Sequence, residues 1–545
     1  MSFASAQFAV FFAALYAAYW WLGLENRKRL LLVASYAFYA LWDWRFVSLL
    51  VLGTLSDYAI GRRIANASHR RKSHWLAVSL SVNLGILGFF KYFDFFATNL
   101  VALSQLFGLH ASPTLLRVAL PIGISFYTFR SLSYTIDIHR GQLKPAQSLL
   151  DYAVFVAFFP FLGAGPIVRA RQFLPQLTRD RRYNPADLEA GFCRFVLGFC
   201  KKAFIADTIG IYLVDPVFAR PGVYGPAVLW LALVGYSVQI YADFSGYSSM
   251  AIGVSRTLGF KVPENFEFPY LARSMSDFWR RWHISMTSWF RDYLWWSVAS
   301  KIPFASHLRW SAALVFVFLA SGLWHGAGWT FVAWGGVHGI ALAANQQWRA
   351  WRETGEPSNG SRSRWSVIPA IFGTNLLVSL GWLLFRAPGF GSAWVFLRGM
   401  FGGGGAARAV STGAEGRGGA ASPPLTGACR RWTVRPRPAA RGLRHCLRAS
   451  GRRAPRASRP TPTPSRRRHG EVEAAPRSRR GTSSRPTAGA WRRRGPAGRE
   501  AQNGDAPARP GQVLRSRRQH RRRRRLGGRP SQVRAPLPRG APSPV

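Results

Sequence analysis

Two histidines in strongly apolar surroundings are the residues of this chain best suited to carry out chemistry. His283 lies in F-W-R-R-W-H-I-S (278–285) and His325 in S-G-L-W-H-G-A-G-W (321–329). A neutral imidazole, whose ordinary pKa is about 6.5, can take a proton from an attacking hydroxyl or thiol near neutral pH. The small residues after His325 would let other groups approach its ring. This favours His325 as a general base, with a structural bridge between helices as the alternative.

A histidine ringed by aromatic side chains, as His283 is, is more commonly a structural group. His338, in G-G-V-H-G, is also predicted to be structural. Asp243 is different, because it lies in the middle of an apolar segment, in Y-A-D-F-S-G-Y-S-S-M (241–250). An ionisable group there costs several kcal/mol unless it is paired or hydrated, which indicates a functional or network position. A structural hydrogen bond to a neighbouring helix is the alternative for Asp243.

The segment 277–294, which carries His283, is predicted to form one amphipathic helix. It holds too many charges for a membrane span and too many tryptophans for a soluble helix, so it should lie in the membrane interface or dip partway into the bilayer. Ser274 and Asp277 could form a capping box, and Asp277 could pair with Arg281 one turn later. The four cysteines show no metal-ligand spacing, so no metal site is predicted.

The elements that must position these residues are membrane helices. The chain of 545 residues is 48% hydrophobic and holds 22 Trp, 39 Phe and 17 Tyr, which is too apolar for an ordinary soluble enzyme. We expect an all-α, multi-pass protein with about ten or eleven crossings of a bilayer about 30 Å thick. The predicted spans lie near residues 5–22, 30–60, 75–100, 115–135, 150–167, 188–214, 226–256, 308–324, 327–347 and 367–387.

Basic clusters indicate how the first spans are oriented. Residues 27–29, 62–63 and 70–72 should lie in cytoplasmic loops under the positive-inside rule. Because two of these clusters flank 30–60, that stretch is predicted to be a hairpin of two helices, joined near residues 42–44. The span 5–22 is expected to be retained, because no basic region precedes it as in a signal peptide.

Two other segments are broken by proline and glycine. They are L-P-I-G-I-S-F-Y-T-F-R (120–130) and F-P-F-L-G-A-G-P-I-V-R (159–169). Backbone freed in this way inside a bilayer is tolerated only where protein or a water-filled cavity surrounds it. We therefore expect these segments to form the walls of an internal chamber or re-entrant loops.

Residues 401–545 differ from the rest in composition. They hold 36 Arg and no Lys, Ile, Tyr or Met, and consist largely of Arg, Pro, Gly, Ala and Ser. Such a segment buries too little apolar surface to offset the entropy of ordering, so we expect a disordered tail after a transmembrane domain at 1–400. The run of Arg at 521–525 could bind nucleic acid or an anionic membrane surface electrostatically, but no specific nucleic-acid partner is predicted.

The motifs of residues 1–400, taken in order, resemble the membrane-bound O-acyltransferase family. L-P-I-G-I-S-F-Y-T-F, A-G-P-I-V-R and Y-A-D-F-S-G-Y-S-S-M-A-I-G precede P-E-N-F, F-W-R-R-W-H-I-S, W-F-R-D-Y-L and S-G-L-W-H-G-A-G-W-T-F. The pattern is similar above all to the bacterial branch that includes the membrane subunits of alginate O-acetyltransferases. The D-alanyl transfer proteins of teichoic acid synthesis are related to this branch.

The resemblance implies a fold and a site. The fold would be a ring of tilted transmembrane helices around a thin centre, with re-entrant or amphipathic helices and a central tunnel that opens to both faces. The family's catalytic histidine matches His325, which would be the catalytic base, and its second histidine matches His283, which would be a supporting catalytic site. Further residues that would bind substrate or support this pair are Asn265, Asp277, Arg280, Arg281, Trp324 and Asp243.

The resemblance also implies a reaction. An O-acetyltransferase of the bacterial inner membrane would pass an acetyl group from a cytoplasmic donor, acetyl-CoA, towards the outside, where a polysaccharide such as alginate is modified. We expect no bound cofactor. The expected partners are the acyl donor, extracytoplasmic acetyltransferase or polysaccharide-modifying proteins, and the lipid bilayer.

The tail is where the chain departs from this family pattern. The branch would continue with one or two more membrane helices after residue 400, and we expect these helices to be missing here. The composition of the tail is what a GC-rich reading frame yields out of register, so we hypothesise a frameshift near codons 400–410. An unambiguous frame through the tail in independent DNA reads would contradict this hypothesis.

Two other functions fit the same residues. In a transporter or flippase, Asp243, Arg130 and the broken helices would form a binding site at the membrane midplane, and inverted repeats would support this reading. In a scaffold for an exopolysaccharide-modifying complex, the histidines would be structural. A His325→Ala variant separates these functions, because only an acyltransferase would lose acyl transfer while keeping membrane assembly.

Overall fold

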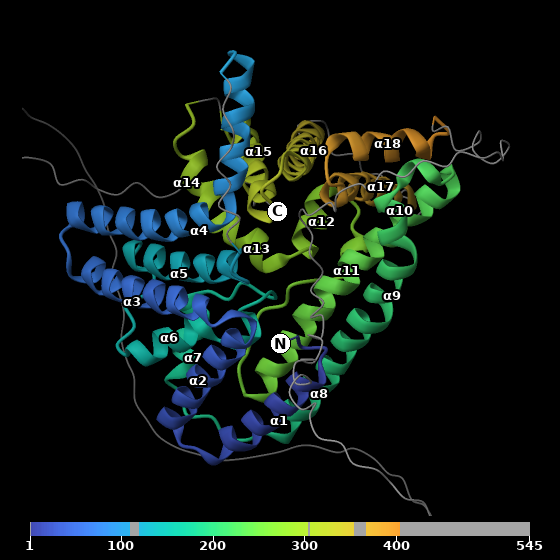
Figure 1. Ribbon diagram of the computed structural model, residues 1–545. Coiled ribbons are helices and arrows are strands. Elements are labelled where there is room, and N and C mark those ends of the chain that lie inside the picture. Colours follow the sequence, from blue (N-terminus) through green and yellow to red (C-terminus); the bar gives the residue numbers. More distant parts are fainter. Residues whose placement is uncertain (1, 110–118, 304–305, 354–366, 404–545) are drawn as a thin grey trace, which may run out of the picture. The chain divides into compact units, whose positions relative to one another are not determined.

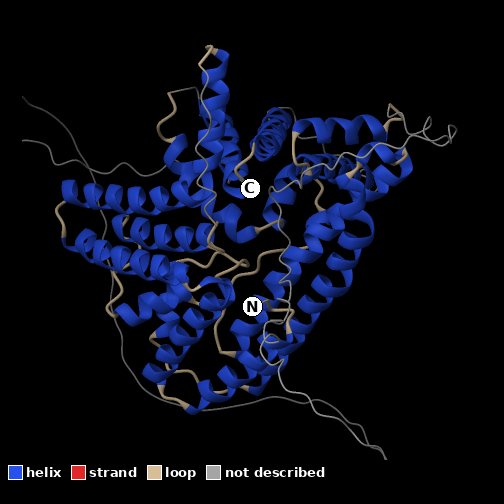
Figure 2. Cartoon of the chain, in the orientation of Figure 1, coloured by secondary structure: helices blue, strands red, loops and turns tan. Residues whose placement is uncertain are grey.

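The computed structural model describes residues 2–109, 119–303, 306–353 and 367–403 (Figure 1). Every regular element within these ranges is a helix, as the colouring in Figure 2 shows. The all-α prediction is therefore confirmed for the part of the chain that the structure describes. The predicted disorder of the tail falls on residues 404–545, which lie outside the described residues.

The helices follow one another in chain order. The first part of the chain forms α1 (Ala6–Trp21), α2 (Leu24–Asp43), α3 (Arg45–Asn66), α4 (His69–Leu106), α5 (Ile124–His139), α6 (Leu149–Ala157), α7 (Ala170–Leu177) and α8 (Pro185–Cys200). The π-helical turns η2 (Lys201–Ala206) and η3 (Gly210–Val214), with α9 (Asp207–Ile209) between them, lead to α10 (Asp215–Ala219) and α11 (Pro226–Thr257). The second part forms α12 (Met275–Arg281), α13 (Ile284–Trp289), η6 (Phe290–Trp295), α14 (Trp296–Ala299), α15 (Ser306–His325), α16 (Trp329–Glu353), α17 (Val367–Arg386) and α18 (Phe390–Met400).

Within the described residues, four helices are long and apolar enough to cross a bilayer. They are His69–Leu106, Pro226–Thr257, Leu308–His325 and Val367–Arg386. Two shorter apolar helices, Ala6–Trp21 and Leu149–Phe161, fall below the usual length of a span. The membrane class is supported by these helices, whereas a total of ten or eleven crossings stays a prediction.

The stretch 30–60 forms two helices that meet near residues 42–44, as expected, whereas their arrangement as a membrane hairpin stays a prediction. α2 ends at Asp43 and α3 begins at Arg45, so a single residue, Trp44, joins the two helices. Asp43 accepts a hydrogen bond from the backbone N–H of Arg45 at 3.1 Å, which stabilises this turn. α3, α4 and α5 then pack against one another and run side by side in Figure 1.

The two segments broken by proline and glycine meet in the structure. Gly123 has a φ of 74° and precedes the start of α5. A Cβ atom at this position would lie 1.6 Å from the backbone oxygen of Leu162, which belongs to the second broken segment. Only glycine permits both this backbone conformation and this close approach.

α15 and α16 form a tight hairpin, and His325 lies at its turn. A Cβ atom at Gly322 would lie 2.2 Å from the backbone oxygen of Phe331, and one at Gly335 would lie 2.1 Å from that of Phe318. Small residues of this kind let two membrane helices approach to backbone contact. The pairing of α15 with α16 therefore sets the position of the His325 ring.

Candidate active site

Asn265 is the centre of a hydrogen-bond network that holds His283. Its side-chain oxygen lies 3.0 Å from Nδ1 of His283 and accepts a hydrogen bond from Oγ of Ser285 at 2.8 Å. Its side-chain nitrogen donates to Oγ of Ser248 in α11 at 3.1 Å. An acceptor oxygen opposite Nδ1 places the proton of the neutral imidazole on Nδ1 and leaves Nε2 as an acceptor.

His283 does not lie within a continuous helix, so the prediction of one helix over 277–294 is wrong. α12 ends at Arg281, α13 begins at Ile284, and α13 is followed by the π-helical η6. His283, between α12 and α13, has a φ of 44° and a ψ of 50°, a left-handed conformation that residues other than glycine seldom adopt. The backbone N–H of Ile284 donates to the backbone oxygen of Asn265 at 2.9 Å, so a group outside the segment stabilises the break.

Two more of the sequence motifs reach this network. In A-G-P-I-V-R, the backbone N–H of Ile167 donates to Oγ of Ser285 at 2.9 Å. In Y-A-D-F-S-G-Y-S-S-M, the ring of Phe244 lies edge-on to His283 with 4.6 Å between ring centroids. His283 is 1% exposed, so segments distant in the sequence together shield its ring from solvent.

His325 ends α15 and lies among aromatic rings. Its ring centroid is 5.2 Å from that of Trp334 in α16 and 5.2 Å from that of Phe385 in α17, with both rings at steep angles to the imidazole. Within the described ranges, no hydrogen bond ties the His325 ring to the protein. An imidazole without a protein partner is available to a substrate hydroxyl.

The Trp324 ring lies near both histidines. Its ring centroid is 4.8 Å from that of His325 and 6.4 Å from that of His283. Burial, and secondly the charge of the nearby His325, lowers the pKa of His283 well below its ordinary value. His283 is therefore neutral near pH 7, and its Nε2 atom is buried with no hydrogen-bond partner among the described residues.

Asp277, Arg280 and Arg281 form an ion-pair cluster on α12. The Asp277 carboxylate lies 3.0 Å from Nε of Arg281, which is the predicted pair one turn apart, and 3.3 Å from Nη2 of Arg280. Ser274 caps the helix by accepting the backbone N–H of Asp277 at 3.1 Å. Burial acts to raise the pKa of Asp277, but the hydrogen bonds from Arg281, the Arg273 backbone and Arg280, together with the charge of Arg281, outweigh it, so the pKa is lowered. In the described part of the chain, neither ion pairs nor hydrogen bonds join this cluster to the two histidines.

Asp243 pairs with a residue of the adjoining π-helical turn. Its carboxylate lies 2.8 Å from Nζ of Lys202 in η2, and the Asp243 side chain is 45% exposed. Lys202 also lies 2.6 Å from the carboxylate of Asp207. This ion pair with a neighbouring helical turn is the kind of contact that a structural role for Asp243 would need. Two other residues of the same motif contact the candidate site, because Phe244 packs against His283 and Ser248 accepts a hydrogen bond from Asn265.

His338 fills a box of tryptophan rings. Its ring centroid lies 5.4 Å from that of Trp279, 5.0 Å from that of Trp334 and 6.1 Å from that of Trp382. A Cβ atom at Gly381 would lie 2.4 Å from Nε2 of His338, so the ring packs directly against the α17 backbone. This dense packing agrees with the structural role predicted for His338.

Sequence reasoning missed three residues around the histidines. Ser285 and Ser248 form hydrogen bonds with Asn265. The sequence pointed to these two serines only through the motifs in which they lie, which were noted for His283 and Asp243. Lys91, in α4, donates a hydrogen bond to the backbone oxygen of Trp324. The signal for Lys91 was a charged residue in an apolar segment, which is also the kind of signal that drew attention to Asp243.

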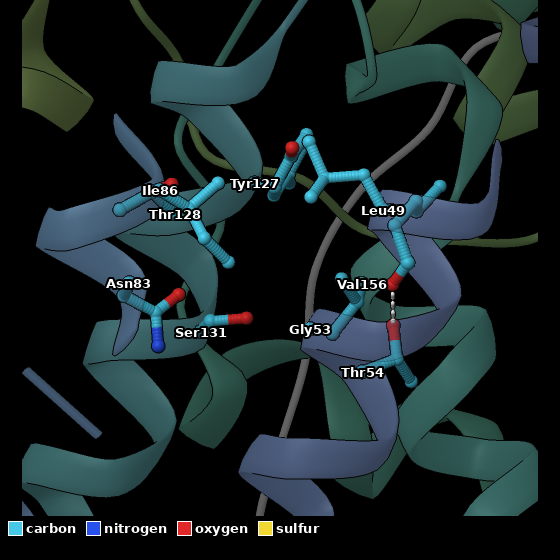
Figure 3. Close-up of a pocket in the computed structure, with 10 residues that line it drawn as sticks. Leu49, Gly53, Thr54, Asn83, Ile86, Tyr127, Thr128, Ser131 and Val156 are labelled. Atoms are coloured by element: carbon cyan, nitrogen blue, oxygen red, sulfur yellow. Dashed lines mark hydrogen bonds between the residues drawn. The ribbon is translucent and has the colours of Figure 1, made fainter. Parts of the chain in front are cut away.

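A small cavity lies between α3, α4, α5 and α6 (Figure 3). Asn83 and Ser131 lie on one side of it and Leu49 and Thr54 on the other. Tyr127 and Thr128, from the broken segment 120–130, also line it. Neither candidate histidine contributes to its wall, so this cavity is separate from the candidate active site.

The arrangement is suited to acid–base chemistry. Two imidazoles lie near one indole ring, one of them held by a buried amide and the other without a protein partner. A search of the described residues finds no group of three or more His, Cys, Asp or Glu that could hold a metal ion.

Comparison with known proteins relates this site to a family. Residues 139–378, which include Asn265, His283 and His325, match the model of MBOAT, the membrane-bound O-acyltransferase family. The match therefore covers the whole hydrogen-bond network around His283 as well as the turn that carries His325.

Several relatives are similar to most of residues 1–400. The chain is 40% identical over 407 residues to the probable alginate O-acetylase AlgI of Azotobacter vinelandii, covering 74% of this chain and 78% of the relative. It is 35% identical over 411 residues to the peptidoglycan O-acetyltransferase of Helicobacter pylori, covering 69% and 74%. It is 30% identical over 280 residues to the teichoic acid D-alanyltransferase of Bacillus subtilis, covering 49% and 69%. The chain is thus an acyltransferase that belongs to the membrane-bound O-acyltransferase family.

Proposed function

We propose that this acyltransferase moves an acetyl group from a cytoplasmic thioester donor, acetyl-CoA, across the membrane for the O-acetylation of an extracytoplasmic polysaccharide such as alginate. The observation that carries the proposal is the placement of both His283 and His325 next to the Trp324 ring. Two relatives, a probable alginate O-acetylase and a peptidoglycan O-acetyltransferase, support acetyl as the group transferred and a polysaccharide of the cell envelope as its destination.

His325 acts as the general base in the proposed reaction. It takes the proton of an acceptor hydroxyl as the hydroxyl oxygen attacks the thioester carbonyl carbon, and the carbonyl electrons move to oxygen. When the tetrahedral intermediate collapses, the carbon–sulfur bond breaks and the thiolate takes the proton from the imidazolium. His283, whose ring also lies near Trp324, supports this step with its Nε2 atom, which has no hydrogen-bond partner among the described residues.

The proposed reaction needs a site that both faces of the membrane can reach. We infer a ring of transmembrane helices around a central tunnel in the bacterial inner membrane, with the histidine pair inside the tunnel. Four apolar helices and two broken segments that meet at Gly123 and Leu162 support this arrangement. Extracytoplasmic polysaccharide-modifying proteins would receive the acetyl group on the far side.

The acetyl content of the secreted polysaccharide tests the proposal. A strain that lacks this gene is complemented with the wild-type gene, with His325→Ala, or with His74→Ala, which changes an exposed histidine at the start of α4. The wild type and His74→Ala should restore acetylation, and His325→Ala should lower it by at least about 100-fold at equal membrane abundance, as expected for loss of a general base.

Two outcomes would count against the proposal. Full acetylation with His325→Ala would make His325 structural and remove the base from the mechanism. Unchanged acetyl content in the strain that lacks the gene would show that the polysaccharide is not the acceptor.

A further inference from the structure

Lys91 is a charged residue inside an apolar helix. It lies in α4, one of the helices long and apolar enough to cross a bilayer, and its side chain is partly buried. Among the residues that the structure describes, no carboxylate forms an ion pair with it. A lysine in such a position is costly and marks a functional site unless a partner compensates its charge.

The ammonium group of Lys91 points at the turn that carries His325. Nζ donates a hydrogen bond to the backbone oxygen of Trp324, the residue before His325, and another to Oγ of Ser125 in α5 at 3.4 Å. It also lies 5.6 Å from the centroid of the Trp324 ring. The side-chain nitrogen of Lys91 thus lies beside the turn that carries the general base of the proposed reaction.

The ammonium group has a donor to spare. A lysine carries three N–H donors, and Trp324 and Ser125 account for two of them. No acceptor for the third is found within the described ranges. A free N–H beside the turn of His325 is the kind of group that binds a developing oxyanion.

We propose that Lys91 stabilises the oxyanion that forms when the acceptor hydroxyl, deprotonated by His325, attacks the thioester carbonyl. The inference rests on the proposed acyl transfer. Attack moves the carbonyl electron pair onto oxygen, and that oxygen accepts the free N–H of Lys91. When the carbon–sulfur bond breaks, the electron pair returns to the carbonyl, the thiolate leaves and the hydrogen bond to Lys91 weakens. Lys91 therefore binds the transition state more tightly than the ground state.

A purely structural role for Lys91 can be separated from this one. Tyr92, which follows Lys91 in α4, also binds the end of α15. Its hydroxyl donates a hydrogen bond to the backbone oxygen of Leu323 at 2.9 Å. If Lys91 only clamped this helix end, then loss of the Tyr92 hydroxyl should have a similar effect. If Lys91 acts on the oxyanion, then loss of the Lys91 amine should lower kcat much more than loss of the Tyr92 hydroxyl.

The test measures turnover of acetyl-CoA by the purified full chain, as release of free CoA, in the wild type and in Lys91→Met, Lys91→Arg and Tyr92→Phe. Lys91→Met keeps the length of the side chain without its charge. We expect it to lower kcat by about 100-fold to 1,000-fold, as for the loss of one oxyanion donor, with the KM for acetyl-CoA changed by less than about threefold. Lys91→Arg should recover at least part of the loss, and Tyr92→Phe should stay within about threefold of the wild type.

Thermal unfolding of each variant in detergent shows whether it folds. A kcat of Lys91→Met close to the wild-type value overturns the inference, and so does an equal loss in Tyr92→Phe. A loss in Lys91→Met that follows a lower unfolding midpoint, with no recovery in Lys91→Arg, also overturns it. A wild-type chain that does not turn over acetyl-CoA would overturn the proposed function and this inference with it. An active wild type beside an equally active Lys91→Met variant overturns this inference alone.

Discussion

At the scale of single residues, the His283 ring depends on a partner from another part of the chain. Asn265 accepts from the side chain of Ser285, faces Nδ1 of His283 and receives the backbone N–H of Ile284. These contacts offset the cost of a left-handed backbone at a residue with a Cβ atom, about 1–3 kcal/mol. The strained conformation is thereby coupled to the orientation of the ring.

His283 should make the protein less stable in acid. Its pKa is lowered in the folded state, chiefly by burial, so the unfolded state, with a pKa of about 6.5, binds a proton more readily. The contribution of His283 to the free energy of unfolding is therefore complete above about pH 6.5 and is lost as the pH falls towards the folded-state pKa. The loss should approach about 1.4 kcal/mol per pH unit.

Thermal unfolding of the full chain in detergent between about pH 5 and pH 8 measures this effect. His283→Gln should lose less stability on acidification than the wild type, because glutamine does not titrate. His74→Gln, at an exposed position, serves as the control and should follow the wild type. Parallel pH curves for the wild type and His283→Gln would contradict a buried neutral His283.

The candidate site could be predicted from the sequence only in part. His283, His325 and Asn265 lie in long motifs, so a family resemblance singles them out, and the structure places Asn265 against His283. Lys91 belongs to no motif that was noted. Lys91 contacts Trp324 because α4 meets the end of α15 in the fold. The two residues are 233 positions apart, so local sequence patterns do not reveal this contact.

At the scale of elements, the break between α12 and α13 shows what periodicity cannot reveal. Charges and tryptophans at helical spacing indicate a helix over 277–294, and helical turns do fill most of it. The interruption at His283 arises from hydrogen bonds to Asn265, which is outside the segment. The junction between α2 and α3 could be predicted, because basic clusters at both ends of the stretch favour two helices over a single span.

The α15–α16 hairpin makes a prediction about two neighbouring glycines. In Gly335→Ala, the new Cβ atom would lie 2.1 Å from the backbone oxygen of Phe318, so α16 must shift away from α15. In Gly336→Ala, it would lie 3.4 Å from Cδ2 of Leu319, an ordinary contact. Gly335→Ala should destabilise the protein by about 1–3 kcal/mol and reduce acetyl transfer, because the shift displaces His325.

Unfolding midpoints and acetyl-CoA turnover of both variants check this prediction. Gly336→Ala is the matched control and should stay within about 0.5 kcal/mol of the wild type. Equal behaviour of the two variants would mean that the closeness of α15 and α16 does not position the site.

At the scale of the whole molecule, the proposed reaction depends on how the helices lie in the bilayer. Composition and hydropathy suffice to predict a membrane protein, because exposing apolar surface to water costs free energy in any fold. The same two properties say less about the number of membrane crossings. Within the described residues, several predicted spans form short helices, π-helical turns or buried irregular segments, whose lengths are set by packing against neighbours.

A transfer from a cytoplasmic donor to an outside acceptor requires that both faces of the membrane reach the turn after His325. Ala327 lies exposed in this turn and is a suitable reporter. We expect Ala327→Cys, in a chain whose native cysteines are replaced by serine, to react with a membrane-impermeant maleimide in right-side-out and in inverted vesicles. Ala232→Cys, at a fully buried position of α11, should react in neither. Because the reagent cannot cross the bilayer, labelling from both sides requires a passage through the protein, whereas labelling from one side alone would rule out a tunnel that opens to both faces.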